Sequence, residues 1–155
     1  MKIHTATLGV VEASPDSFLT LPEGLVGFEE HKEYALLALA DYEPFRWLQS
    51  FSDPGLSFPL LDPIALVPGY EPVLTDADRQ SLALAAGELP VVYAVATVSE
   101  SGGEVTLNLR APLLINPRER IARQVVLADS RWEIQHPVLT RRSAGRESVR
   151  TQSAI

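Results

Sequence analysis

The chain of 155 residues contains no cysteine, and this absence excludes several kinds of chemistry at once. It can form no disulfide, it has no thiolate nucleophile, and it cannot build a metal site on cysteine ligands. Long hydrophobic runs are missing too, because no segment approaches the roughly 18 apolar residues of a membrane span. The first residues, 1–5, lack the apolar core of a signal peptide. These features predict a soluble, cytoplasmic protein without a membrane partner.

Basic residues are scarce in the first part of the chain. Residues 1–109 contain 4 Lys and Arg against 16 Asp and Glu, a net charge of −12, whereas residues 110–155 contain 9 against 4, a net charge of +5. Nucleic-acid binding relies on Lys and Arg to neutralise phosphates, so the acidic part argues against direct nucleic-acid binding. It would instead attract a basic protein partner. Acids that only keep the domain soluble are the alternative explanation.

Signatures of catalysis and of cofactor binding are also absent. The sequence has no Gly-x-Ser-x-Gly elbow for a nucleophilic serine and neither of the glycine-rich patterns that hold phosphates. Its histidines, His4, His31 and His136, are each expected to be structural or solvated. His31 lies within an acidic run, residues 29–33, but such a run more often forms a solvated face than a metal site. We therefore expect no enzymatic activity, no cofactor and no metal.

The chain is rich in short apolar runs with strand character, separated by turn residues. They occur at residues 2–7, 10–13, 18–21, 34–39, 45–51, 57–61, 64–67, 91–98, 105–115 and 124–127. Many short strands with one or two short helices predict an all-β fold, either a small antiparallel barrel or a sandwich-like domain. The length suits one domain with one core, which we place at residues 1–139.

One helix has a clear start signal. Thr75 is followed three positions later by Asp78, the spacing of a capping box, and Ala77–Ala86 contains good helix formers. Gly87 is a typical stop. A single helical turn is also predicted within residues 28–34.

The most regular alternation in the chain lies in residues 105–115. Apolar residues occupy every second position, and the positions between them include Asn108 and Arg110. This two-residue period predicts a strand that is half buried against a core. Pro112 cannot donate to a sheet hydrogen bond, so the strand must lie at an edge, carry a bulge, or break into two shorter strands.

The same segment resembles a known family. Asn108–Pro117 reads Asn-Leu-Arg-Ala-Pro-Leu-Leu-Ile-Asn-Pro, which is similar to the Asn-Leu-x-Ala-Pro-x-x-Ile-Asn motif of the FliW family of flagellar assembly factors. Six further pieces resemble the family and follow its order: Pro22–Phe28, Trp47–Ser50, Asp62–Pro63, Tyr70–Pro72, Gln124–Leu127 and His136–Pro137. Each piece alone is weak, but together, over residues 1–139, they make the resemblance specific.

The resemblance implies a cytoplasmic regulator that acts by binding proteins and catalyses nothing. Members of the family bind the translational repressor CsrA and relieve its block on flagellin mRNA. They also bind flagellin, so that unassembled flagellin exchanges one complex for the other. CsrA is a small, basic RNA-binding dimer, which an acidic surface would attract in a salt-sensitive manner. The family precedent favours a non-competitive, allosteric antagonist, and we expect the chain itself to be a monomer.

Candidate partner-binding residues are the polar and aromatic side chains of these segments that fall near predicted loops or at polar strand positions. They are Glu23, Phe28, Asp62, Tyr70, Glu71, Asn108 and Arg110. Large aromatic side chains anchor interfaces when they are exposed. For Asn108 and Arg110 a structural role is the alternative, because they could satisfy backbone groups around Pro112. Asp62 and Glu71 stand beside prolines, so loop geometry explains them equally well.

Other classes of function stay open at this point. A small β-barrel could bind a metabolite, or act as a hydrolase through a site that one sequence does not reveal. Either would require a deep pocket lined with convergent polar groups. Direct RNA binding through the basic C-terminal third is weaker, because its arginines are not interleaved with aromatic residues.

Residues 140–155 differ from the rest of the chain. They contain Arg141, Arg142, Arg146 and Arg150 but few bulky apolar residues, a composition that predicts a disordered basic tail. Members of the family usually end near the position of His136–Pro137, so the resemblance says nothing about this segment. It is either an unselected extension or a segment that folds back on the acidic domain or engages an anionic partner.

Overall fold

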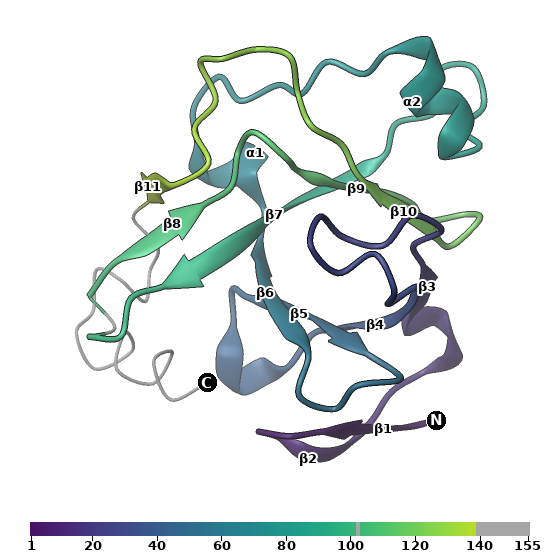
Figure 1. Cartoon of the computed structure of the whole chain (residues 1–155), viewed down its shortest axis with the longest axis vertical. Coiled ribbons are helices and arrows are strands. Elements are labelled where there is room, and N and C mark those ends of the chain that lie inside the picture. The colour runs from purple at the N-terminus through teal and green to yellow at the C-terminus, as the bar shows by residue number, and fades with distance from the viewer. Residues whose placement is uncertain (102, 139–155) are drawn as a thin grey trace.

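Seven strands close into a barrel in the computed structural model, which describes residues 1–101 and 103–138 (Figure 1). They are β3 (Phe18–Thr20), β4 (Glu33–Leu37), β5 (Arg46–Ser50), β6 (Ser57–Leu61), β7 (Val91–Val98), β10 (Ile121–Gln124) and β9 (Leu113–Asn116). Neighbours pair along the order β7-β6-β5-β4-β3-β10-β9, and a further pairing of β7 with β9 closes the ring. The predicted all-β fold is confirmed as a barrel. The predicted tail lies outside the described residues.

One ladder departs from the predicted antiparallel arrangement. β3 and β10 run parallel, with Thr20 opposite Ile121, whereas the other pairs of the ring are antiparallel. Parallel neighbours need a long connection, and more than half of the chain separates these two strands.

Further elements lie around the ring. β1 (Lys2–Thr5) and β2 (Gly9–Glu12) form a separate hairpin. β8 (Val105–Leu107) pairs on one side with the C-terminal part of β7 and on the other side with β11 (His136–Val138). The helices are α1 (Pro63–Leu66) and α2 (Asp76–Ser81), and short 3₁₀ turns span Pro15–Ser17 and Ala40–Tyr42. The two short helices agree with the predicted fold class.

Two apolar layers follow from the alternation of side chains along the strands. The barrel interior is filled by side chains that all seven strands supply, including Leu19, Tyr34, Leu48, Leu60 and Leu113, which are fully buried. A second layer lies outside the ring, between the strands and the segments that cover them, and contains Trp47, Leu61, Tyr70, Leu82, Leu107 and Leu127.

The strand predicted over residues 105–115 is two strands. β8 ends at Leu107 and β9 begins at Leu113, with Pro112 in the connection. Of the three arrangements that the proline allowed, the break is the one observed. The strand predicted at residues 124–127 begins and ends three residues earlier in the structure, where β10 covers Ile121–Gln124.

Three local predictions were wrong. Residues 64–67 lie largely in α1 instead of a strand, because Asp62 Oδ1 accepts hydrogen bonds from the backbone N–H of Ile64 and Ala65 and Pro63 occupies the first helical turn. Residues 28–32 form a turn that leads into β4, and residues 33–34 already belong to β4, so the predicted helical turn is absent there. The capping box at Thr75 is present, but the helix is shorter than predicted: α2 ends at Ser81, whereas the helix formers continue to Ala86.

Candidate partner-binding surface

The seven candidate residues lie in three places on the barrel. Glu23 and Phe28 belong to the loop between β3 and β4, which we call the β3–β4 loop, residues 21–32. Asn108 and Arg110 lie in the connection between β8 and β9, Tyr70 contacts this connection at Leu109, and Glu71 follows Tyr70 in the chain. Asp62 caps α1 on its own.

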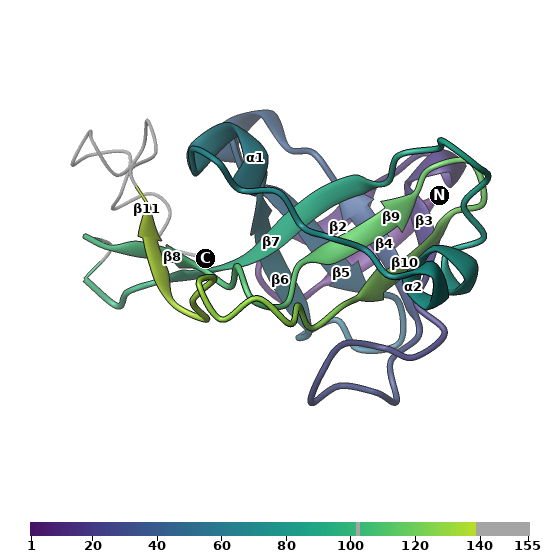
Figure 2. The ribbon, with the colours of Figure 1, turned by 90° about the horizontal axis from the view of Figure 1, so that it is seen from above.

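The β3–β4 loop stands out from one end of the barrel (Figure 2). Gly24 has a φ of +66°, and a Cβ there would lie 2.7 Å from Glu29 Cα, so only glycine fits. Lys32 Nζ closes the loop by donating to the carbonyl oxygens of Pro22, at 2.9 Å, and of Glu29, at 3.0 Å. Leu25 inserts into the barrel interior. The loop is therefore built to hold a fixed shape.

This loop presents apolar and acidic side chains to solvent. Val26 is 64% exposed, although its N–H donates to Gln124 Oε1. Phe28 is 39% exposed and packs edge-on against Phe58, with 5.1 Å between ring centroids. Phe28 is thus packed against the barrel and still partly exposed to solvent. Hydrogen bonds from the Gly27 and Glu29 N–H groups lower the pKa of Glu29, which keeps this side of the loop negative.

A chain of charges connects the β3–β4 loop to α2. Arg123, on β10, lies between Glu23 and Asp78: its Nε is 3.1 Å from Glu23 Oε2, as an ion pair without hydrogen-bond alignment, and its Nη1 donates to Asp78 Oδ1 at 3.0 Å. Two carboxylates thus share one guanidinium, so the cluster keeps a net negative charge. Glu23 is the more exposed of the two.

Glu71 lies at a groove of about 290 Å³ beside this cluster. One wall is formed by Glu71, Val73, Thr75 and Asp78, and the other by residues 125–129 with Trp132. Asp78 belongs both to the groove and to the charge chain, so the groove and the β3–β4 loop form one continuous surface. We call it the acidic surface.

Tyr70 is buried behind the groove and packs against Trp132, one of its lining residues. It is 4% exposed, its hydroxyl donates to the Leu109 carbonyl oxygen at 2.7 Å, and its ring meets Trp132 edge-on with centroids 4.8 Å apart. Burial raises the pKa of its hydroxyl, so it stays a neutral donor. The geometry favours a structural role, and direct contact of Tyr70 with a partner stays a prediction.

Asn108 and Arg110 hold the chain at the break between β8 and β9. Asn108 Oδ1 accepts from the Ala111 N–H at 3.0 Å. Arg110 Nε donates to the Trp132 carbonyl at 2.8 Å, and its Nη2 donates to the Ser130 carbonyl at 3.3 Å. These contacts satisfy backbone groups that no ladder serves, which favours the structural explanation for both residues.

Asp62 lies apart from the acidic surface. Its carboxylate caps α1 and lines a different hollow, of about 360 Å³, together with Arg46, Ile64 and Tyr93. Capping accounts for this acid without a partner.

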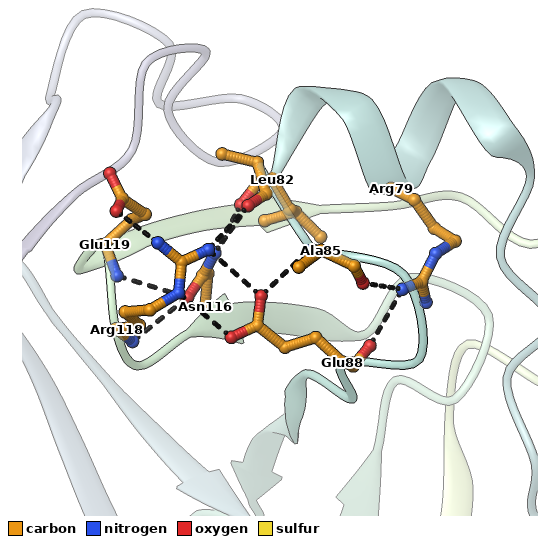
Figure 3. A network of polar contacts seen from close by, with 8 residues as sticks. Arg79, Leu82, Ala85, Glu88, Asn116, Arg118 and Glu119 are labelled. Carbon is orange, nitrogen blue, oxygen red and sulfur yellow. Dashed lines mark hydrogen bonds and ion pairs between the residues drawn. The ribbon is translucent and has the colours of Figure 1, made fainter.

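Asn116 is the residue whose role the sequence reasoning missed (Figure 3). It is fully buried; its Nδ2 donates to the carbonyls of Leu82 and Ala83, and its Oδ1 accepts from the N–H groups of Arg118 and Glu119. These bonds satisfy carbonyl groups just past the end of α2, where Ala83 turns into the left-handed region with a φ of +55°. Its position at the end of the Asn108–Pro117 motif was the available signal, but it reads equally as a turn residue.

Charged residues surround Asn116 and complete a clamp, which we define as Arg79, Glu88, Asn116 and Arg118. Arg118 donates from Nε and Nη2 to the two carboxylate oxygens of Glu88, each at 3.1 Å, and Arg79 donates to the carbonyls of Ala85 and Glu88 (Figure 3). The hydrogen bond from Arg118, followed by that from the Ala85 N–H, lowers the pKa of Glu88 to about 2. The clamp fastens the loop after α2 to the turn after β9.

Within residues 1–101 and 103–138, no group of three or more His, Asp or Glu side chains is arranged to hold a metal ion. In the same residues, no helix is long and apolar enough to cross a membrane.

The fold and the site together define a class: a small closed β-barrel whose interior is packed with apolar side chains and whose acidic side chains lie at the surface. Comparisons with known proteins assign this barrel to a family. The FliW protein family model matches residues 2–139, and the chain therefore belongs to the FliW family.

Individual relatives cover nearly the whole chain. A flagellar assembly factor FliW of Treponema denticola is 38% identical over 147 residues, which cover 93% of this chain and 97% of the relative. One from Syntrophus aciditrophicus is 37% identical over 142 residues, covering 92% and 90%. A crystal structure of the flagellar assembly factor FliW superposes with a TM-score of 0.80 at 32% identity, covering 90% of this chain and 98% of that chain.

Proposed function

We propose that this member of the FliW family is a cytoplasmic, monomeric and non-catalytic regulator of flagellar assembly with two protein partners. It binds CsrA and relieves the repression of flagellin mRNA, and it binds flagellin, which exchanges one complex for the other. The observation that carries the proposal is the family membership over residues 2–139, because the relatives are flagellar assembly factors.

The distribution of charge supports a basic partner such as CsrA. Among the acids of residues 1–109, all except Asp78 and Glu88 are exposed, so the negative charge faces solvent. A basic dimer would be drawn to this surface, and its association would slow as salt screens the field. The acidic surface offers Glu23, Phe28 and Glu71 as contacts, with a half-exposed aromatic ring among carboxylates.

The packed interior argues against a metabolite-binding barrel. Leu19, Tyr34, Leu48 and Leu60 are all fully buried inside the ring, where a ligand cavity would have to lie. The Tyr34 hydroxyl is a buried polar atom of this cluster without a hydrogen-bond partner, and one hydroxyl is not a convergent polar set.

A gel-shift experiment tests the proposal. Purified chain is added to a complex of CsrA with a flagellin leader RNA, and we expect free RNA to appear while the chain itself leaves RNA unshifted. Excess RNA separates the modes: an allosteric antagonist keeps its effect as RNA rises, and a competitive one loses it. A chain that shifts the RNA directly, or that leaves the CsrA complex intact at all concentrations, would contradict the proposal.

A further inference from the structure

We propose that the groove beside Glu71 binds an extended segment of a partner protein by strand addition, with aliphatic and basic side chains alternating along that segment. This inference rests on the proposed function in one respect, namely that the protein acts by binding another protein. It goes further by assigning the place, the binding mode and the chemistry of the bound segment.

The first observation is an open strand edge. Val125 and Leu127 donate their N–H groups to the carbonyls of Pro112, at 3.0 Å, and Arg110, at 2.8 Å, which continues the β9–β10 ladder past its regular end. Successive backbone groups of an extended chain point to opposite sides, so Val126 directs its N–H and C=O away from that ladder. Within the described part of the chain, the backbone groups of Val126 and Ala128 make no hydrogen bond.

The second observation is how the two walls face the groove. Five consecutive residues, 125–129, line one wall, which places this stretch of the chain along the groove with its backbone beside it. Glu71, Val73 and Thr75 line the other wall at every second position, as one side-chain face of an extended segment does. A guest strand would thus meet backbone on one side and side chains on the other, which is the arrangement of β-augmentation.

The third observation concerns the chemistry of the lining. Val73 is 79% exposed and Val126 is 64% exposed, and the half-buried Trp132 lines the same groove, so aliphatic side chains of a guest would find apolar contacts. Carboxylates line the same groove at Glu71, Asp78 and Asp129. Asp78 and Asp129 already pair with arginines, whereas Glu71 has no ion-pair partner among the described residues and is free to meet a basic side chain.

The size of the groove agrees with this occupant. A volume of about 290 Å³ is at the lower limit for a drug-sized ligand. It suits a few side chains of a strand whose remainder lies over the surface.

The proposal is tested by nuclear magnetic resonance with a designed probe, the peptide acetyl-Val-Lys-Val-Lys-Val-Lys-Val-amide, titrated into the full ¹⁵N-labelled chain. We expect the largest shifts at the amides of Val126 and Ala128 and at Val73, and slower hydrogen exchange of the Val126 and Ala128 amides by at least about tenfold at saturation. The same peptide N-methylated at alternate residues should not bind, because it cannot pair through its backbone. Shifts centred elsewhere, or none at millimolar peptide, would overturn the proposal.

Matched variants locate the contacts. Val73→Lys and Glu71→Lys should each weaken peptide binding roughly fivefold, as expected for the loss of one apolar or charged rim contact. Leu89→Lys, at a site that is 80% exposed, and Glu104→Lys are the controls and should bind as the parent does. Equal weakening in variants and controls would indicate a general charge effect and contradict the assigned site.

Two other occupants are distinguished in the same experiment. Replacing Arg141, Arg142, Arg146 and Arg150 with Gln in the full chain should leave the groove amides unchanged; if they move, the chain's own C-terminal segment fills the groove and the proposal is wrong. Groove amides that shift with protein concentration alone would indicate a second copy, which contradicts it equally. The test contains neither CsrA nor flagellin, so its failure leaves the proposed function standing.

Discussion

The clamp around Asn116 and the groove beside Glu71 both lie next to the segment Asn108–Pro117, but they differ in whether their polar groups have partners within the protein. In the clamp, side chains satisfy one another and the backbone, and the central amide is fully buried. In the groove, backbone groups of Val126 and Ala128 and the Glu71 carboxylate face solvent without protein partners in the described residues. The most recognisable motif of the sequence thus builds the scaffold, and the surface available to a partner lies beside it.

The largest expected effect comes from breaking the clamp. Asn116→Ala leaves the carbonyls of Leu82 and Ala83 and two N–H groups without their side-chain partner, so we expect the free energy of unfolding to fall by about 3 kcal/mol. Urea unfolding followed by circular dichroism measures it. Asn108→Ala, which removes one half-buried hydrogen bond, is the control and should cost about 1 kcal/mol. Equal losses in the two variants would show that Asn116 is not central to the scaffold.

A smaller loss of stability should follow from a change in the β3–β4 loop. Gly24→Ala places a Cβ 2.7 Å from Glu29 Cα on a backbone with positive φ, and we expect about 2 kcal/mol of destabilisation together with weaker partner binding. Gly27→Ala is the matched control: its φ is +88°, but nothing lies within 4 Å of the added Cβ, so only about 1 kcal/mol is expected. Thermal unfolding compares the two. If both variants behave alike, close packing does not fix the loop.

A substitution in the groove should change partner binding but not the free energy of unfolding. Glu71 is exposed, so Glu71→Lys should leave the free energy of unfolding within about 0.5 kcal/mol of the parent. Its association rate with CsrA should fall several-fold, and the difference from the parent should shrink between low and high salt, since charge steering is screened. Stopped-flow mixing at two salt concentrations gives both rates. A difference that persists at high salt would point to lost contacts instead of lost steering.

The smallest effect is a pH dependence within the clamp. The pKa of Glu88 is lowered to about 2, below the ordinary carboxyl value that it has in the unfolded chain. Its contribution to stability is therefore fully present above about pH 4.5 and is lost as the pH falls toward 2. Glu88→Gln removes this ionisation, so the stability difference between parent and variant should narrow over that range. A constant difference from pH 6 to pH 2 would contradict the assignment.

Short-range chemistry could be predicted from the sequence. The capping box at Thr75 and Asp78 uses residues three positions apart, and the strands Ser57–Leu61 and Val91–Val98 have the predicted bounds, because turns, prolines and apolar runs mark them locally. The break at Pro112 was among the predicted arrangements for the same reason.

Long-range pairing could not be predicted in this way. The contact of β7 with β9 that closes the barrel and the parallel contact of Thr20 with Ile121 depend on where distant segments meet. The carbonyl of Leu82, just past the end of α2, accepts a hydrogen bond from Asn116, which lies more than thirty residues away along the chain. The groove likewise exists only because the segment around Glu71 and the segment after β10 come together, and no single segment carries its signature.

The affinity of the Glu71→Lys chain for CsrA and for flagellin, measured by isothermal titration calorimetry beside Glu104→Lys, tests most directly whether partners bind at the acidic surface. We expect Glu71→Lys to weaken binding of at least one partner roughly fivefold and Glu104→Lys to leave binding of both unchanged. If both partners bind Glu71→Lys as tightly as they bind the parent, the acidic surface around this groove is not where the protein meets its partners.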